Sequence, residues 1–166
     1  MIEADDVDCS LAVPCLEERH DLGCYLEQIW RAYFADTPRV NEVTIGYCYP
    51  WKSRLGLIRL SLDHCVSFIG VNTLLQSPLI PEYVVLVTIA HELAHYAHGF
   101  GSPLPRLCSH PHANRVVDRE LESRALGVQL RCCNEWIDKN WLSFYYKQRD
   151  MGWADLYGTC RASALS

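Results

Sequence analysis

The sequence predicts an α+β domain in which a small antiparallel or mixed sheet packs beside about four helices. Short stretches in the first half of the chain alternate apolar and polar residues, or are rich in β-branched residues, as strands are. Longer stretches on both sides of them repeat their apolar residues with the 3.6-residue period of a helix face. One of the helices carries a His-Glu-x-x-His motif, which gives this fold class a candidate metal site.

Length and composition are those of one globular domain. The chain has 166 residues, of which 49% are hydrophobic and 21% charged. We expect a flexible leader at residues 1–14, a single domain over residues 15–150 and a C-terminal tail at residues 151–166. The net charge of −5 gives no overall attraction to nucleic acid or to an anionic membrane, and no apolar run reaches the ~18 residues of a membrane span.

The first half of the chain is predicted to hold one helix and the strands. A helix over residues 15–34 is indicated by apolar side chains that recur on one face: Leu22, Leu26, Ile29 and Tyr33. Alternation at residues 43–47 predicts a short strand. Residues 55–62 and 66–72 are predicted to form a hairpin around Asp63-His64-Cys65.

The second half is predicted to be helical. Pro81 suits the first position of a helix and Glu82 complements its positive end, so a helix is expected over residues 81–97. A loop rich in Gly, Pro and Ser follows. Two further helices are predicted from their apolar periodicity, at residues 114–132 and 134–149.

Nine cysteines are present, and their number is odd. The acidic first residues lack the apolar core of a signal peptide, and no Cys-x-x-Cys pair indicates a zinc ribbon. We therefore expect reduced thiols and a cytoplasmic protein. The adjacent Cys132 and Cys133 are interpreted as ordinary helix residues, since free cysteine is commonly buried.

The helix at residues 81–97 contains the motif His91-Glu92-Leu-Ala-His95. Positions i and i+4 lie on one face of a helix, so His91 and His95 can offer two imidazoles to one ion. In zincin metallopeptidases such a pair binds Zn²⁺ and the glutamate is the general base. The match can arise by chance in a chain with seven histidines. The helix, however, is apolar on nearly all sides, and polar groups buried in it require a partner.

A third protein ligand must come from later in the chain. His98 is interpreted as a surface residue or a cation at the helix end, because three ligands from one helix rarely close on an ion. His110 and His112 follow a loop long enough to fold back over the helix. Glu120 is the other candidate, although it is also explained as an exposed residue paired with Arg124. We favour His112 and keep Glu120 and His110 as alternatives.

Residues 69–85, together with the His-Glu-x-x-His motif, resemble the SprT-like zinc metallopeptidases. In that family a Pro-initiated helix carries the motif, and a loop brings a third histidine in an H-x-x-x-F context, which His112-Ala-Asn-Arg-Val116 matches with Val for Phe. The resemblance spans roughly residues 54–141 and implies a zincin-like fold with Zn²⁺ held by His91, His95 and His112. It also suggests nucleic-acid association, which the acidic charge does not support, and the C-terminal zinc ribbon of many relatives is absent from the sequence.

A second resemblance competes with the first. The run that begins Glu120-Leu-Glu-Ser-Arg is similar to the E-x-E-A-N/D helix of ImmA-like and M48-like gluzincins. This resemblance implies that Glu120 is the third ligand and that His112 lies in the second shell. A non-catalytic, zinc-binding regulatory module is a further alternative, but the intact Glu92 favours an enzyme. A cysteine peptidase is disfavoured because no local signature accompanies the cysteines.

The sequence thus predicts a zinc metalloendopeptidase that acts on a protein or peptide substrate. The zinc ion lowers the pKa of its bound water toward ~7 and polarises the scissile carbonyl. Glu92 takes the proton from that water and passes it to the leaving amine. The strand at residues 66–71 is expected to pair with an extended substrate. Tyr96, Arg106 and Arg115 are the nearest candidates for the residue that stabilises the oxyanion.

Overall fold

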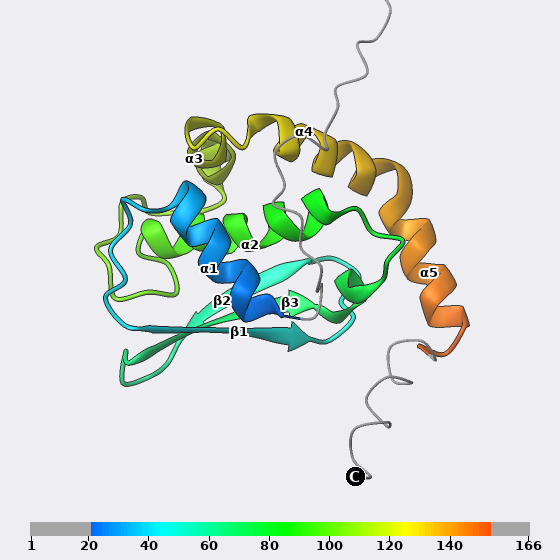
Figure 1. Ribbon diagram of the computed structural model, residues 1–166, viewed down its shortest axis with the longest axis horizontal. Coiled ribbons are helices and arrows are strands. Elements are labelled where there is room, and N and C mark those ends of the chain that lie inside the picture. The colour runs from blue at the N-terminus through cyan, green and yellow to red at the C-terminus, as the bar shows by residue number, and fades with distance from the viewer. Residues whose placement is uncertain (1–20, 154–166) are drawn as a thin grey trace, which may run out of the picture.

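The computed structural model describes residues 21–153, which form an α+β arrangement of one mixed sheet and helices stacked on one of its faces (Figure 1). The strands are β1 (Glu42–Cys48), β2 (Gly56–Leu60) and β3 (Val66–Asn72). Helices α1 and α2 lie against the sheet, and α3 and α4 lie beyond α2. Within these residues no helix has the length and apolar character needed to cross a lipid bilayer.

The sheet has the order β1-β3-β2, with β1 parallel and β2 antiparallel to β3. The predicted hairpin of β2 and β3 is therefore confirmed, with Ile58 opposite Ile69. The expectation that the strand at residues 66–71 pairs with a substrate is wrong, because both sides of β3 are occupied by other strands. Among residues 21–153, β2 has no strand partner on its outer side, and this edge of the sheet is the one beside the candidate site.

Helix α1 (Leu22–Tyr33) begins after Asp21, whose carboxylate accepts a hydrogen bond from the backbone N–H of Cys24 at 2.9 Å. Its predicted apolar face is buried against α2 and β1, as the 3.6-residue period requires. The expected helix began at residue 15, and its first six positions, 15–20, lie outside the described residues.

Helix α2 (Glu82–Ala97) follows Pro81 as predicted, and it is buried along most of its length between the sheet and α4. Val84, Leu86, Ile89 and Leu93 are all buried in the main core. The helix stops at His98, and Gly99 follows with a φ of 78°. A side chain at Gly99 would meet the carbonyl oxygen of Pro105 at 2.4 Å, so the turn requires glycine in both conformation and space.

The boundary between the last helices differs from the prediction. Helix α3 (Val116–Ser123) ends nine residues before the predicted helix end at residue 132, and α4 (Gly127–Trp136) begins after a turn at Ala125, which has a φ of 63°. The N–H of Leu126 donates to the carbonyl of Leu121 at 2.9 Å, and both side chains are buried, as in a Schellman motif. Alanine occupies the left-handed position where glycine is usual, so the sequence carries no stop signal there.

Helix α4 runs without interruption through a π-helical segment, Ile137–Trp141, into α5 (Leu142–Asp150). Counted with α4–α5 as one continuous helix, residues 21–153 therefore contain four α-helices, which are α1, α2, α3 and α4–α5. At the end of the π segment the indole N–H of Trp141 donates to the carbonyl of Lys52 at 2.7 Å. This bond joins the C-terminal helix to the loop that precedes β2.

The cysteines of the described part of the chain are not all thiols. Free cysteines are found at Cys24, Cys48, Cys65, Cys108 and Cys133. Cys132 is disulfide-bonded, so the expectation of reduced cysteines is wrong for this residue. Cys133 is a buried helix residue, as predicted. Cys9, Cys15 and Cys160 lie outside the described residues.

Candidate metal centre

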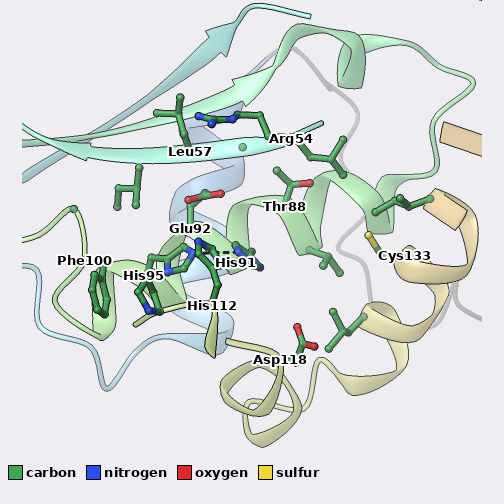
Figure 2. Close-up of a pocket in the computed structure, with 18 of the residues that line it drawn as sticks. Arg54, Leu57, Thr88, His91, Glu92, His95, Phe100, His112, Asp118 and Cys133 are labelled. Carbon is green, nitrogen blue, oxygen red and sulfur yellow. Dashed lines mark hydrogen bonds between the residues drawn. The ribbon is translucent and has the colours of Figure 1, made fainter. Parts of the chain in front are cut away.

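Three histidines converge above the buried face of α2 (Figure 2). His91 and His95 lie one helical turn apart, and their Nε2 atoms are 3.1 Å from each other. The ring of His112 lies 4.8 Å from that of His95 and 6.1 Å from that of His91, measured between ring centroids. One nitrogen from each of the three residues lies within 4.8 Å of the others, which is the spacing of a metal-ligand set.

The loop after α2 carries His112 back to the helix. Its path begins with Gly99 and Gly101, both in the left-handed region, and is tied to the helix end where the N–H of Phe100 donates to the carbonyl of His95 at 2.9 Å. His112 itself directly precedes a short 3₁₀ turn, η3 (Ala113–Arg115). His95 is only 5% exposed and His112 is exposed, so the cluster joins a buried wall to a surface loop.

The donor set fits a zinc ion. Burial lowers the pKa of His91 to about 4 and that of His95 to about 3, so both rings are neutral at pH 7 and can offer a lone pair. Two nitrogens held tetrahedrally at 2.0–2.1 Å from one zinc ion would be about 3.3 Å apart, close to the 3.1 Å between the two Nε2 atoms. An all-imidazole set of three is a known catalytic zinc site, with the fourth position open.

Glu92 lies beside the histidines with its carboxylate directed toward β2 (Figure 2). Its residue exposure is 5%, and burial raises the pKa of its carboxyl to about 8, although Arg54 acts in the opposite direction. Strand β2 approaches the carboxylate closely at Gly56, where an added Cβ would lie 2.8 Å from Oε1 of Glu92 and 3.0 Å from Cγ2 of Thr88. The glycine therefore leaves room for the glutamate between helix and strand.

Glu120 is not part of the histidine cluster. Its Oε2 atom lies 3.0 Å from Nε2 of His98, and its Oε1 accepts a hydrogen bond from Nε of Arg124 at 2.8 Å. Burial raises the pKa of Glu120, but the hydrogen bonds from His98 and Arg124 outweigh it and the pKa is lowered overall. His98 is only 4% exposed, so its interpretation as a surface residue is wrong, although it does lie at the end of α2.

The sequence analysis proposed three residues that could stabilise an oxyanion, and none of them lines the pocket above the histidines. Tyr96 is fully buried, and its hydroxyl donates to Oδ1 of Asn41 at 2.9 Å. Arg115 is paired with Asp118 at 3.1 Å, and Arg106 lies 5.1 Å above the ring of Phe100. His110, the minor candidate ligand, is exposed and is not among the clustered histidines.

A pocket of about 680 Å³ opens above the histidines. Phe100 lies at one end and Cys133 at the other, with the three imidazoles between them (Figure 2). Arg54 and Asp118 also line it, and sequence reasoning missed both. Neither belongs to a local motif, because Arg54 comes from the loop before β2 and Asp118 from α3, and only the tertiary fold brings them to α2.

Comparisons of the chain with protein-family models, with curated proteins and with solved structures find no match.

Proposed function

We propose that the protein is a zinc metallopeptidase of SprT-like type in which His91, His95 and His112 hold the ion and Glu92 is the general base. The proposal rests mainly on one observation, the convergence of three imidazoles beside a buried carboxylate in an open pocket. The engagement of Glu120 by His98 and Arg124 favours this ligand set over the gluzincin alternative. Protein or peptide segments are the proposed substrates.

The chemistry divides between the ion and the chain. A bound zinc ion would supply Lewis acidity, which lowers the pKa of water and polarises a carbonyl oxygen. The pKa of the Glu92 carboxyl, which burial raises to about 8 in the absence of a metal ion, would be lowered by the positive charge of a bound ion. The ionised carboxylate would then accept the proton of the attacking water and deliver it to the leaving amine nitrogen. The apolar walls around Glu92 exclude bulk water from that carboxylate, which strengthens its electrostatic interactions.

Substrate would be held by the edge of the sheet. Residues 55–58, at the start of β2, line the pocket, and this edge carries no strand partner among the described residues. An extended peptide can add to such an edge through backbone hydrogen bonds. Gly56 brings the β2 backbone close to Glu92. A peptide paired with β2 would therefore cross the pocket beside the carboxylate.

Metal analysis of four proteins tests the ligand assignment. Wild type purified without chelator should carry about one zinc ion per chain, as a site with three protein ligands does. His112→Ala should weaken zinc binding at least tenfold, because loss of even an outer partner of a metal ligand costs about ten- to a hundredfold. Glu120→Ala and the loop control His110→Ala should keep it. Zinc lost from Glu120→Ala and retained by His112→Ala would replace this assignment with the gluzincin set.

Hydrolysis is tested separately with a fluorescently labelled unfolded protein as substrate. Zinc-loaded wild type should release labelled peptides, and release should stop when a chelator is added. Zinc bound at full stoichiometry without any hydrolysis would instead support a non-catalytic zinc module.

A further inference from the structure

Two arginines lie near the two ends of β2, whose edge borders the pocket. Arg54 comes from the loop before β2 and lines the pocket directly (Figure 2). Arg106 comes from the loop after α2, and its guanidinium lies 5.1 Å from the centroid of the Phe100 ring, which marks one end of the pocket. The cleft along β2 is therefore bordered by a positive charge before the strand and by another beyond it.

A second hollow continues the pocket past the C-terminal end of β2. Its volume is about 580 Å³, and it shares Ile58 and Gly101 with the first pocket. Arg59 and Arg106 are among its lining residues, whereas no Asp or Glu of residues 21–153 lines it. A segment that extends along β2 from the histidines thus enters a hollow with basic walls.

The guanidinium groups of Arg54 and Arg106 are free to bind an anion. Both side chains are exposed, and within residues 21–153 neither forms an ion pair. Each lies over an aromatic ring instead, Arg54 at 5.7 Å from the Trp51 centroid and Arg106 over Phe100. Stacking occupies the face of a guanidinium and leaves the N–H groups at its edge for a carboxylate. Four other arginines are already paired with carboxylates: Arg39, Arg115, Arg124 and Arg149.

The acidic residues that face the cleft do not neutralise these arginines. Among the described residues, Glu92 and Asp118 are the two carboxylates in the pocket lining. Glu92 lies beside the histidines, and Asp118 is paired with Arg115 at 3.1 Å. The two ends of the cleft therefore carry positive charge, although the whole chain has a net charge of −5.

Two separate cations suit a peptide with acidic side chains better than they suit a nucleic acid. A nucleic acid is held by the neutralisation of many phosphates along its backbone, which the net negative charge of this chain opposes. A peptide can instead pair its backbone with the edge of β2 and place one acidic side chain near each arginine. The charges of the cleft thus favour an acidic peptide as its ligand.

We infer that the cleft selects peptide segments that carry an acidic residue, Asp or Glu, on each side of the scissile bond, with Arg54 binding one carboxylate and Arg106 the other. This inference rests on the proposed peptidase function, because it names the substrate class of the same site. It narrows the substrates from any peptide to acidic, extended segments.

Peptide binding to zinc-loaded Glu92→Gln protein tests the charge preference without turnover. Three fluorescent peptides of about ten residues share a neutral centre and carry Glu, Gln or Lys on both sides of it. The Glu peptide should bind at least about tenfold more tightly than the Gln peptide, and the Lys peptide should bind more weakly than both. A rise from about 0.05 M to about 0.5 M salt should remove most of this difference, because salt screens exposed charges. Cleavage by zinc-loaded wild type should follow the same order in kcat/KM.

Charge reversal locates the preference. Arg54→Glu and Arg106→Glu should each reduce the preference for Glu over Gln at least about threefold, and the double variant should prefer the Lys peptide. Arg119→Glu makes the same charge change at an exposed position of α3 outside both linings, so this matched control should keep the preference. Thermal melts establish that all variants are folded.

The outcomes separate the two proposals. Equal affinity for the Glu and Gln peptides, or a preference that survives in the double variant, would overturn the acidic-substrate assignment and leave the peptidase function standing. Displacement of the Glu peptide by a single-stranded oligonucleotide of similar length and higher affinity would also overturn it in favour of a nucleic-acid ligand. If no zinc is bound and no peptide is cut, the proposed function itself fails and the substrate class fails with it.

Discussion

At the scale of single residues, the surroundings of a side chain indicate its function. Glu92 is the clearest case, because a carboxyl group with 5% exposure among apolar walls is expensive unless it has a function or a partner. The motif around it was predictable because His91, Glu92 and His95 are local in sequence and share one helix face. The sequence favoured His112 over Glu120 as the third ligand but did not decide between them. The position of His112 beside α2 depends on the path of a loop with left-handed glycines, which the sequence does not specify.

Substitution of Glu92 by Gln should abolish hydrolysis and preserve zinc binding. The amide keeps the size of the side chain but cannot accept the proton, so the rate should fall by several orders of magnitude. Zinc content and the thermal midpoint of the same sample should stay close to those of wild type. Unchanged hydrolysis would mean that another group is the base.

Substitution of Gly56 by Ala should impair hydrolysis through position rather than chemistry. The new methyl group would stand 2.8 Å from Oε1 of Glu92, so the carboxylate must move. Because displacement of a catalytic group by about 1 Å can cost up to a hundredfold, kcat/KM should fall about ten- to a hundredfold while zinc content stays constant.

Gly46→Ala is the matched control for Gly56→Ala. Gly46 lies in β1, and its added Cβ would meet only the Phe68 ring, at 3.6 Å, which is ordinary van der Waals contact. Hydrolysis by this variant should match wild type. Equal activity of both variants would show that the close contact at Gly56 does not position Glu92.

At the scale of elements, Arg124 joins three parts of the fold. It follows α3 and donates to Glu120 in that helix. It also donates to the carbonyl of Tyr33, the last residue of α1, at 2.7 Å and to Asp36 in the following turn at 2.6 Å. Its guanidinium lies 4.3 Å above the ring of Phe34. The arginine therefore fixes the turn between α3 and α4 against α1.

Replacement of Arg124 by Met should destabilise the fold by about 2–3 kcal/mol, because it removes the hydrogen bonds from the guanidinium to Glu120 and to the carbonyl of Tyr33. The free energy of unfolding, measured with urea on metal-free protein, checks this value. Lys139→Met removes an exposed pair with Glu135 at 3.8 Å and should change little. A loss equal to that of Lys139→Met would contradict the role of Arg124.

The elements also show which local signals determine structure. Pro81 and Glu82 mark the start of α2, and alternation marks the hairpin, because both depend on neighbouring residues. The turn at Ala125 was missed because alanine stands at its left-handed position, where glycine would have marked the helix end. The burial of Leu121 and Leu126 in the core, which the local sequence does not show, accompanies this turn. The central position of β3 in the sheet was also missed. Its parallel pairing with β1 joins strands that are not consecutive in sequence, and no local sequence pattern indicates such a pairing.

For the whole molecule, the network around Arg124 predicts how stability responds to acid. The hydrogen bond from Arg124 lowers the pKa of Asp36 from 3.8, and that of Glu120 is lowered from 4.5 as described above. Carboxyls with depressed pKa values stabilise the fold above their unfolded-state values, and this stability is lost as the pH falls through the folded values. In metal-free protein this network should therefore add a loss of stability below about pH 4.5 to the loss below about pH 6.5 that the lowered pKa values of His91 and His95 cause.

The comparison with Arg124→Met isolates this contribution. Urea unfolding between pH 6 and pH 3 should show a smaller acid-induced loss in the variant than in wild type, because the variant lacks the cation that depresses both pKa values. Parallel pH curves for the two proteins would show that other groups control acid unfolding.

The π-helical segment Ile137–Trp141 sets the rotational phase of everything after it. A π turn arises when one residue is inserted into an α-helix, and each residue of an α-helix turns the following side chains by about 100°. Without this wider turn, the same number of residues wound as regular α-helix would carry Trp141 about 100° around the helix axis, away from the carbonyl of Lys52. The loop that leads into β2 would lose that anchor. The extra residue of the π turn is thus matched to the position of the loop before β2, so a further residue inserted into the regular turns of α4 would displace Trp141 while a one-residue deletion within the π turn would not.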